Sequence, residues 1–405
     1  MVCPGKSAIP HPRHKLGLLA NLEMGKVIIP DAGLGGGSEP DKSRRKGCGV
    51  KALDPASGNE SAAAALGIVG IGFMGMIHFL AARRAGITVA AICTRDPKKR
   101  AGDWSAIKGN FGPPGGPTDL TGVNAHASID DLLADESVTL VDLCVPSDEH
   151  APMAIRALEA GKDVLVEKPI ALDLADADAM IAAAGRSGRK LMVAHVLPFF
   201  DEFAYALDAV RSGRFGKLLA VQLDRVIARP AWSEGVVDAG RSGGPAVDLH
   251  IHDTHFVGVL CGTPRAVRSR GVRREGAVAH LSTQYLYDDP NLVVAATSGA
   301  LSMPGRPFAH GFQVWLERAT ITFGFADHAG SGVVSPLSVF HEDGRVEAPA
   351  SGSGDPIDAF ARELAMAAGP GPVPPELSAG MARQALAACL AEVRSVETGG
   401  EIALT

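Results

Sequence analysis

Residues 66–75 read Leu-Gly-Ile-Val-Gly-Ile-Gly-Phe-Met-Gly, and residues 164–169 read Val-Leu-Val-Glu-Lys-Pro. The first stretch is an apolar strand that enters a glycine-rich turn, Gly70-x-Gly72-x-x-Gly75, before a predicted helix over 74–85. This order is typical of dinucleotide binding, because glycines admit the pyrophosphate and a helix N-terminus offers it free N–H groups. The second stretch places Lys168 at the end of a later strand of the same predicted sheet. Together they indicate an enzyme that acts on a small molecule with a nicotinamide cofactor.

Residues 61–82 hold no charged side chain other than a protonated His78. Hydropathy alone would indicate a membrane span there, and the Arg44-Arg45 pair upstream would suit an export signal. The glycine-rich turn interrupts the run, however, and a buried parallel strand followed by a buried helix face has the same hydropathy. We therefore interpret the segment as part of a nucleotide-binding fold, with no membrane association.

The residues after the second predicted strand, 88–93, bear on the choice of cofactor. Thr94 stands where an acid that binds the adenosine ribose is expected. Arg95 follows it and could accept a 2′-phosphate, which favours NADP over NAD. Asp96 could be the ribose ligand instead, although an Asp before Pro at a helix start is more often an N-cap.

Composition limits the class of protein. The chain has 405 residues, enough for two domains, with 46% hydrophobic residues and a formal charge of −6. That charge argues against nucleic-acid binding by bulk electrostatics. The six cysteines show no C-x-x-C spacing, so neither a zinc knuckle nor a redox pair is indicated. A reducing, cytoplasmic setting fits.

The chain divides into three parts. Residues 1–60 are rich in Gly, Pro, Lys and Arg, and we expect a disordered extension or an over-long gene start. Residues 61–195 alternate strands and helices, which predicts a doubly wound parallel sheet of the Rossmann type. Residues 196–405 change rhythm, and we expect an α/β domain with a mainly antiparallel sheet. Within the middle part, strands are expected at 64–69, 88–93, 138–145, 164–167 and 190–195, helices at 74–85, 97–103, 150–160, 173–186 and 201–212, and a loop at 109–122.

The C-terminal part is predicted from period-two alternation and from two helical runs. The alternation begins at 217–227, and the helical runs are 356–368 and 378–397, separated by a Pro- and Gly-rich loop. Few helices separate the strands, which favours antiparallel pairing. The further strand-like runs lie at 264–272, 278–287, 291–300 and 311–323.

A second chemical motif follows Gly243-Gly244. The run 248–255 contains Asp248, His250, His252, Asp253 and His255. On one helix Asp248, His252 and His255 would share a face, where Asp248 would orient or polarise His252. A neutral histidine is a suitable base for a hydroxyl proton. A metal bound by His252, His255 and Asp248, with His195, is an alternative that we do not favour.

These motifs in combination resemble the Gfo/Idh/MocA family, named for glucose-fructose oxidoreductase and inositol dehydrogenase. The similarity covers about 65–400 and rests on the glycine turn, on 145–150 (Val-Pro-Ser-Asp-Glu-His), on 160–169 with Glu167-Lys168-Pro169, on His195 and on 243–252. It implies a Rossmann domain followed by an α/β domain whose open sheet often makes oligomer contacts. Thr94, His250 and His255 depart from the usual family residues.

The resemblance also implies roles for single residues. Lys168 is similar to the catalytic lysine, with Asp248 and His252 beside the reacting hydroxyl and His252 as general acid/base. Pro146, His150 and Glu167 would line the nicotinamide end of a cofactor site begun by Gly70, Gly72, Phe73, Met74 and Gly75 and continued by Thr94 and Arg95. His195 and His255 would lie in the substrate pocket.

The sequence therefore predicts an NAD(P)-dependent oxidoreductase acting on a CH–OH group of a carbohydrate-like substrate, as a homo-oligomer and with no bound metal. One alternative is a redox-neutral lyase, epimerase or glycosidase that uses tightly bound NAD. Another is a non-catalytic NAD(P)-binding sensor, which would need neither Lys168 nor His252. Trp232 could stack on a sugar face, and Arg225, Arg229 and Arg241 are candidates for binding an anionic group.

Overall fold

The computed structural model describes residues 64–109, 111–228, 242–350, 352 and 354–404. The predicted extension, residues 1–60, lies outside this set, and so do Arg229, Trp232 and Arg241. All the elements below belong to one compact unit within Asn59–Thr405.

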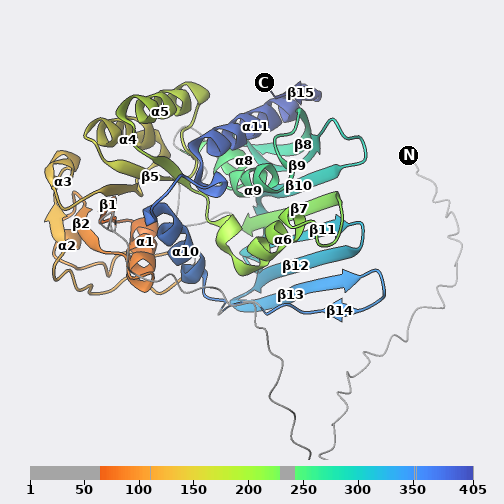
Figure 1. The fold of residues 1–405 in the computed structure, drawn as a ribbon, viewed down its shortest axis with the longest axis horizontal. Helices are drawn as coiled ribbons and strands as arrows, with labels where there is room; N and C mark the ends of the chain where they lie inside the picture. The colour runs from red at the N-terminus through yellow and green to blue at the C-terminus, as the bar shows by residue number, and fades with distance from the viewer. Residues whose placement is uncertain (1–63, 110, 229–241, 351, 353, 405) are drawn as a thin grey trace, which may run out of the picture. The chain divides into compact units, whose positions relative to one another are not determined.

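The N-terminal half forms a six-stranded sheet with the order β3-β2-β1-β4-β5-β6. Figure 1 labels β1, β2 and β5 of this sheet. Every neighbouring pair is parallel, which confirms the predicted Rossmann-like sheet. The short, partly exposed β3 was not predicted, because three residues give too little hydrophobic alternation. The strands are β1 (Leu66–Val69), β2 (Val89–Cys93), β3 (Asn124–His126), β4 (Leu140–Leu143), β5 (Asp163–Glu167) and β6 (Leu191–Ala194).

Three of the helices that follow these strands begin at a residue whose side chain caps them. Asp96, Ser128 and Asp173 each accept a hydrogen bond from a backbone N–H in the first turn of their helix. Asp96 is thus an N-cap, and α2 is shorter than the predicted 97–103. The helices are α1 (Phe73–Arg84), α2 (Pro97–Arg100), the unpredicted α3 (Ile129–Ala134), α4 (His150–Glu159) and α5 (Leu174–Ser187).

Alternate residues of each strand pack into separate cores on the two faces of this sheet. In β5, Val164 and Val166 pack with α4 and α5, whereas Leu165 packs with α1. Two helices from the end of the chain complete these layers: α11 (Ala379–Thr398) joins the first core and α10 (Pro356–Ala368) joins the second. The face covered by α1 and α10 is described further below, because α1 carries both the glycine-rich turn at its start and His78.

The C-terminal half forms a nine-stranded sheet with the order β14-β13-β12-β11-β7-β10-β9-β8-β15. Only the β10–β7 pair is parallel, so the sheet is mainly antiparallel, as predicted. The predicted single strand over 311–323 is wrong, because a turn at 317–318 divides it into a hairpin. The strands are β7 (Leu218–Ala228), β8 (Ala266–Arg274), β9 (Ala277–Leu286), β10 (Val293–Ser302), β11 (Phe308–Leu316), β12 (Ala319–His328), β13 (Ser331–His341), β14 (Val346–Glu347) and β15 (Glu401–Ala403).

Helices α6 (Asp201–Arg211) and α9 (Ile251–Cys261) pack on this sheet through Phe203, Phe256 and Val257. The short α8 (Pro245–Asp248) precedes α9. The single helix predicted to carry Asp248, His252 and His255 is therefore broken at residues 249–250. The short 3₁₀ turns are η1 (Ser147–Glu149), η2 (Leu197–Phe199) and η3 (Pro375–Leu377).

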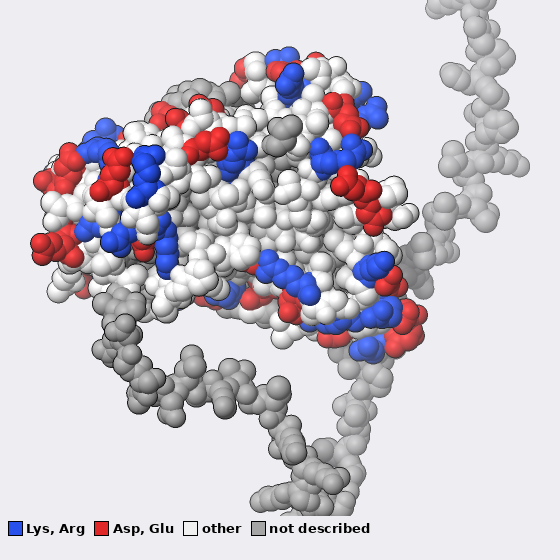
Figure 2. Space-filling view, turned by 45° about the horizontal axis from the view of Figure 1, so that its top comes forward, with Lys and Arg blue, Asp and Glu red and all other residues white. Residues whose placement is uncertain are grey.

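The surface carries mixed charge. Figure 2 shows Lys and Arg side chains interspersed with Asp and Glu on the face drawn. Among the described residues, no helix is long and apolar enough to cross a membrane.

Candidate active site

The glycine-rich turn lies between β1 and α1 and has the geometry expected for a dinucleotide cradle. Gly70 has a φ of +91°, and a side chain there would collide with the backbone of Cys144. A side chain on Gly75 would collide with the carbonyl oxygen of Gly70. Gly72, by contrast, faces open space and caps α1 without a side chain. A pyrophosphate therefore fits against the N-terminus of α1, beside Phe73 and Met74.

The loop after β2 is basic. Asp96 uses its carboxylate to cap α2, by accepting a hydrogen bond from the N–H of Lys98 at 2.9 Å. Thr94 is half-buried, whereas Arg95 and Lys98 are exposed. Arg100 donates to the carbonyl oxygen of Thr94 at 2.7 Å. Cationic side chains thus gather where an acid would otherwise bind a ribose.

Lys168 directly follows β5 and contacts the end of α8. Its Nζ donates to the carbonyl oxygen of Asp248 at 2.9 Å and to Asp248 Oδ1 at 3.0 Å. The lysine side chain is 16% exposed and that of Asp248 is 23% exposed, so the pair is accessible to a small molecule. The structure therefore brings together two of the three predicted catalytic residues, from positions eighty residues apart.

His252 lies in the first turn of α9 and is half-buried. Burial lowers its pKa well below the usual value, and the charges of Lys168 and Arg225 lower it further. The ring is therefore neutral at neutral pH, as a base must be. Asp248 uses its carboxylate on Lys168, so the break between α8 and α9 gives the aspartate a different partner from the one predicted.

His195 and His255 stack face to face, with ring centroids 3.8 Å apart and an interplanar angle of 4°. Both are buried, and none of their four ring nitrogens has a hydrogen-bond partner among the described residues. Burial lowers the pKa of His255 to about 3, and burial and then His255 lower the pKa of His195 well below its usual value. The predicted substrate-pocket histidines thus form a buried, neutral pair.

His250 points away from this pair. Its Nδ1 lies 2.6 Å from Ser298 Oγ, and its Nε2 lies 3.1 Å from Glu392 Oε2. Arg225 is also internal, because it forms a bidentate ion pair with Asp253 at 2.9–3.0 Å. Neither residue is therefore available to a substrate in this arrangement.

His150 contacts the residue that follows the lysine. His150 is buried at the start of α4, where its Nδ1 lies 2.8 Å from the carbonyl oxygen of Pro169 and its Nε2 lies 3.0 Å from that of Val145. Pro146 precedes η1. His150 thus joins the end of β4 to the segment that follows Lys168.

The nucleotide-binding part matches the family model described as "Oxidoreductase family, NAD-binding Rossmann fold" over 65–195, and the following part matches the "GFO/IDH/MocA C-terminal domain" over 203–322. The chain belongs to the Gfo/Idh/MocA family.

Known proteins with this likeness include enzymes of carbohydrate chemistry. Inositol 2-dehydrogenase of Rhizobium meliloti is 28% identical over 47% of this chain and 57% of its own length. The 2,7-anhydro-N-acetylneuraminate hydratase of Mediterraneibacter gnavus is 32% identical over 42% and 45%. The chain thus spans about half of the length of these curated relatives. A solved structure of levoglucosan dehydrogenase with NADH and levoglucosan matches the fold, with a TM-score of 0.66, 19% identity and coverage of 84% of this chain and 99% of that one.

A buried cluster next to Lys168 was not predicted from the sequence. His78 on α1 lies 2.8 Å (Nδ1) from Asp142 Oδ2 on β4 and 3.1 Å (Nε2) from Glu167 Oε1 on β5. Cys144 Sγ is 3.5 Å from His78 Nδ1, and Glu363 on α10 is buried nearby. In the described part of the chain, His78, Asp142 and Cys144 are the one group close enough to hold a metal, so the predicted alternative at His252 and His255 is not such a group. The available signals were a lone histidine in an uncharged run and an aspartate inside a strand.

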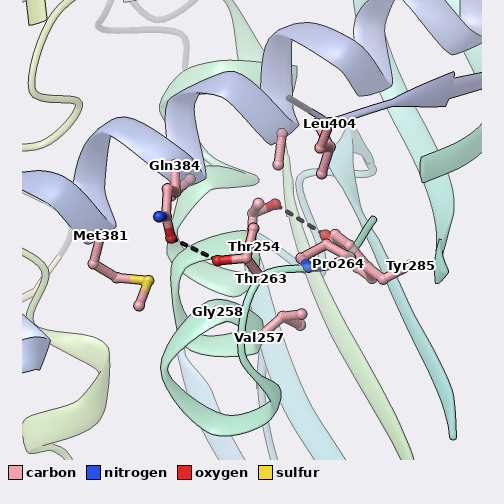
Figure 3. A pocket seen from close by; sticks show the side chains of 11 residues that line it. Thr254, Val257, Gly258, Thr263, Pro264, Tyr285, Met381, Gln384 and Leu404 are labelled. Carbon is pink, nitrogen blue, oxygen red and sulfur yellow. Dashed lines mark hydrogen bonds between the residues drawn. The ribbon is translucent and has the colours of Figure 1, made fainter. Parts of the chain in front are cut away.

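A small hollow lies elsewhere, between α9, β9 and α11 (Figure 3). Thr263 donates to Gln384 Oε1 at 2.6 Å across it, and Thr254 and Tyr285 hydroxyls are 2.9 Å apart. None of the predicted site residues lines it. We therefore place the candidate active site at Lys168 and the glycine turn.

Proposed function

We propose that this protein is an NAD(P)-dependent oxidoreductase that moves hydride between nicotinamide and a hydroxyl or carbonyl group of a sugar, a polyol or a related compound. The observation that carries the proposal is the Lys168–Asp248 pair, which lies at the carboxyl end of β5 in the sheet that also carries the glycine turn. Ligands of open parallel sheets bind at this edge. The names of the two enzyme relatives with carbohydrate substrates support the substrate class.

Lys168, Asp248 and His252 would have separate roles in the reaction. The nicotinamide ring, when bound, accepts or supplies the hydride. The Lys168 ammonium group donates a hydrogen bond to the substrate oxygen and stabilises its developing negative charge, while Asp248 holds the ammonium in place. Neutral His252 takes the hydroxyl proton during oxidation and returns it during reduction.

The same proposal assigns the cofactor site. Gly70, Gly72, Phe73, Met74 and Gly75 would hold the pyrophosphate at the start of α1. Pro146, His150 and Glu167 would surround the nicotinamide end. The side chains of His150 and Glu167 are buried, so these two residues would shape the site mainly through their backbone.

We further propose that NADP is preferred. Arg95 and Lys98 are exposed beside Thr94, and no carboxylate other than the capping Asp96 lies in this short segment. Two exposed cations suit a 2′-phosphate, and a ribose diol would lack its usual acidic partner.

The test is to denature the purified protein, identify any released nicotinamide dinucleotide by mass spectrometry, and titrate the empty protein with NADPH and NADH. We expect tighter binding of NADPH, and we expect Arg95→Ala to weaken NADPH binding about tenfold while changing NADH binding little. Equal binding of both dinucleotides would contradict the NADP assignment. No binding of either would contradict the proposed function itself.

A redox-neutral reaction is the second candidate, because one relative is named a hydratase. It requires a cofactor that is retained and regenerated in each turnover. Near-stoichiometric dinucleotide in the purified protein, with activity on a sugar panel in the absence of added cofactor, would favour this alternative. Empty protein whose activity depends on added NADP would favour the ordinary dehydrogenase.

A further inference from the structure

The buried cluster around His78 lies next to the proposed site, but the chemistry above does not use it. His78 contributes a ring from α1, Asp142 a carboxylate from β4, and Glu167 a carboxylate from β5. A metal ion does not fit the arrangement well, because both ring nitrogens of His78 already face carboxylate oxygens at 2.8 and 3.1 Å. The cluster is instead held by the hydrogen bond between His78 Nδ1 and Asp142 and by the ion-pair contact between His78 Nε2 and Glu167 Oε1.

Glu167 connects this cluster to the lysine. Its Oε1 faces His78, while its Oε2 accepts a hydrogen bond from the backbone N–H of Lys168 at 3.0 Å. The glutamate is only 7% exposed, so its carboxylate has little water to bind instead. The rotamer of Glu167, and with it the peptide that carries Lys168, is therefore held from α1.

We propose that His78 is a positioning residue, which fixes the direction of Lys168 toward Asp248 through the Glu167 carboxylate. The inference rests on the proposed function, since it assumes that Lys168 is the residue whose placement matters. His78 lies less than one helical turn beyond Gly75, on the helix α1 whose N-terminus would receive the pyrophosphate. One helix thus supports both the cofactor cradle and the lysine.

The charges agree with this role. Burial disfavours a charged ring at His78, but the charge and the hydrogen bond of Asp142 outweigh it and raise the pKa well above the usual value. Burial also opposes ionisation of Glu167, and the nearby charges of His78 and Lys168 outweigh it and lower the pKa. Glu363, the remaining acid that faces the ring, is kept neutral because burial raises its pKa. A cation between two carboxylates holds its geometry more firmly than neutral partners would.

The first experiment needs no substrate. Wild type, His78→Asn, Glu167→Gln and the double variant are treated with acetic anhydride, and acetylation of Lys168 is followed by mass spectrometry. His341→Asn is the matched control, because His341 pairs with Glu347 at 3.2 Å on the distant strands β13 and β14. We expect Lys168 to react severalfold faster in both single variants, at the wild-type rate in the control, and no faster in the double variant than in either single one.

Unchanged Lys168 reactivity in folded His78→Asn or Glu167→Gln would overturn the inference, and so would multiplied effects in the double variant. Glu167→Gln keeps the side-chain volume and the His78–Asp142 pair, so it carries the test if His78→Asn does not fold.

The second experiment uses a substrate identified from the sugar panel. We expect His78→Asn to lower kcat about tenfold or more while KM for the substrate stays within about twofold, because a misplaced lysine affects the transition state more than binding. Wild-type kcat in this variant would also overturn the inference. Failure of the proposed function has a different signature, which is wild-type turnover in Lys168→Ala. The acetylation experiment tests the role of His78 whether or not Lys168 proves to be catalytic.

Discussion

Two histidine clusters lie close to Lys168, and they have opposite charge states. His78 is buried between Asp142 and Glu167, and its pKa is raised. His195 and His255 are equally buried but face each other, and their pKa values are lowered. Burial acts in the same direction on all three rings, against the charged form.

The difference shows that the partner, and not the depth of burial, decides the charge of a histidine. A carboxylate about 3 Å away reverses the effect of desolvation, whereas a second imidazole adds to it. The result is a cationic ring beside Asp142 and Glu167 and a neutral pair of buried rings at His195 and His255. In the proposed mechanism, the neutral pair adds no positive charge to that of Lys168.

The largest expected effect on turnover comes from replacing Lys168, which lies near both clusters. Lys168→Ala should lower turnover about 10²–10⁴-fold, because it removes the donor to the substrate oxygen. Dinucleotide affinity should stay close to that of wild type, measured by fluorescence titration. Lys217→Ala, at an exposed position before β7, is the control and should keep full activity. Turnover of Lys168→Ala near the wild-type rate would contradict the assignment.

The next effect tests the charged cluster. His78→Asn should lower the free energy of unfolding by about 3–5 kcal/mol at pH 6, because it leaves buried carboxylates unpaired. The pKa of His78 is raised above its unfolded value of about 6.5, so its stabilisation is complete below that pH and is lost as the pH rises toward the folded pKa. The difference from wild type should therefore shrink at pH 8.5, as measured by urea unfolding at both pH values. A difference that grows with pH would show that His78 is neutral.

A smaller effect of opposite sign tests the neutral pair. The pKa of His255 is lowered to about 3, so its contribution is present above pH 6.5 and is lost as the pH falls. The wild type should lose about 1.4 kcal/mol per pH unit from this group between about pH 6 and 4. His255→Phe keeps a ring in the stack and should have a correspondingly flatter dependence in urea unfolding. An unchanged slope in this variant would mean that His255 is charged in the folded protein.

The sequence could predict the charged cluster less well than the site beside it. The glycine turn and Lys168 belong to short, strongly patterned segments, where apolar strands end in a turn. The carboxylates that pair with His78 come from β4 and β5, and pairing over such separations depends on the tertiary fold. The same holds for Glu392, which reaches His250 from the far end of the chain.

Local misinterpretations had local causes. The run 245–261 has helical periodicity throughout, and the break at 249–250 leaves no Gly or Pro to signal it. Because of this break, Asp248 does not share a helix face with His252, and its carboxylate instead pairs with Lys168. Similarly, the turn at 317–318 consists of Glu and Arg, so nothing in composition divides β11 from β12.

The most direct test is a ¹⁵N NMR measurement of the histidine side chains, with His78→Asn and His255→Phe used to assign the resonances. At pH 7.5 we expect an imidazolium spectrum for His78, with both ring nitrogens protonated, and neutral spectra for His195, His252 and His255 that persist at pH 6. A neutral His78 at pH 7.5, or a charged His255 at pH 6, would contradict this expectation.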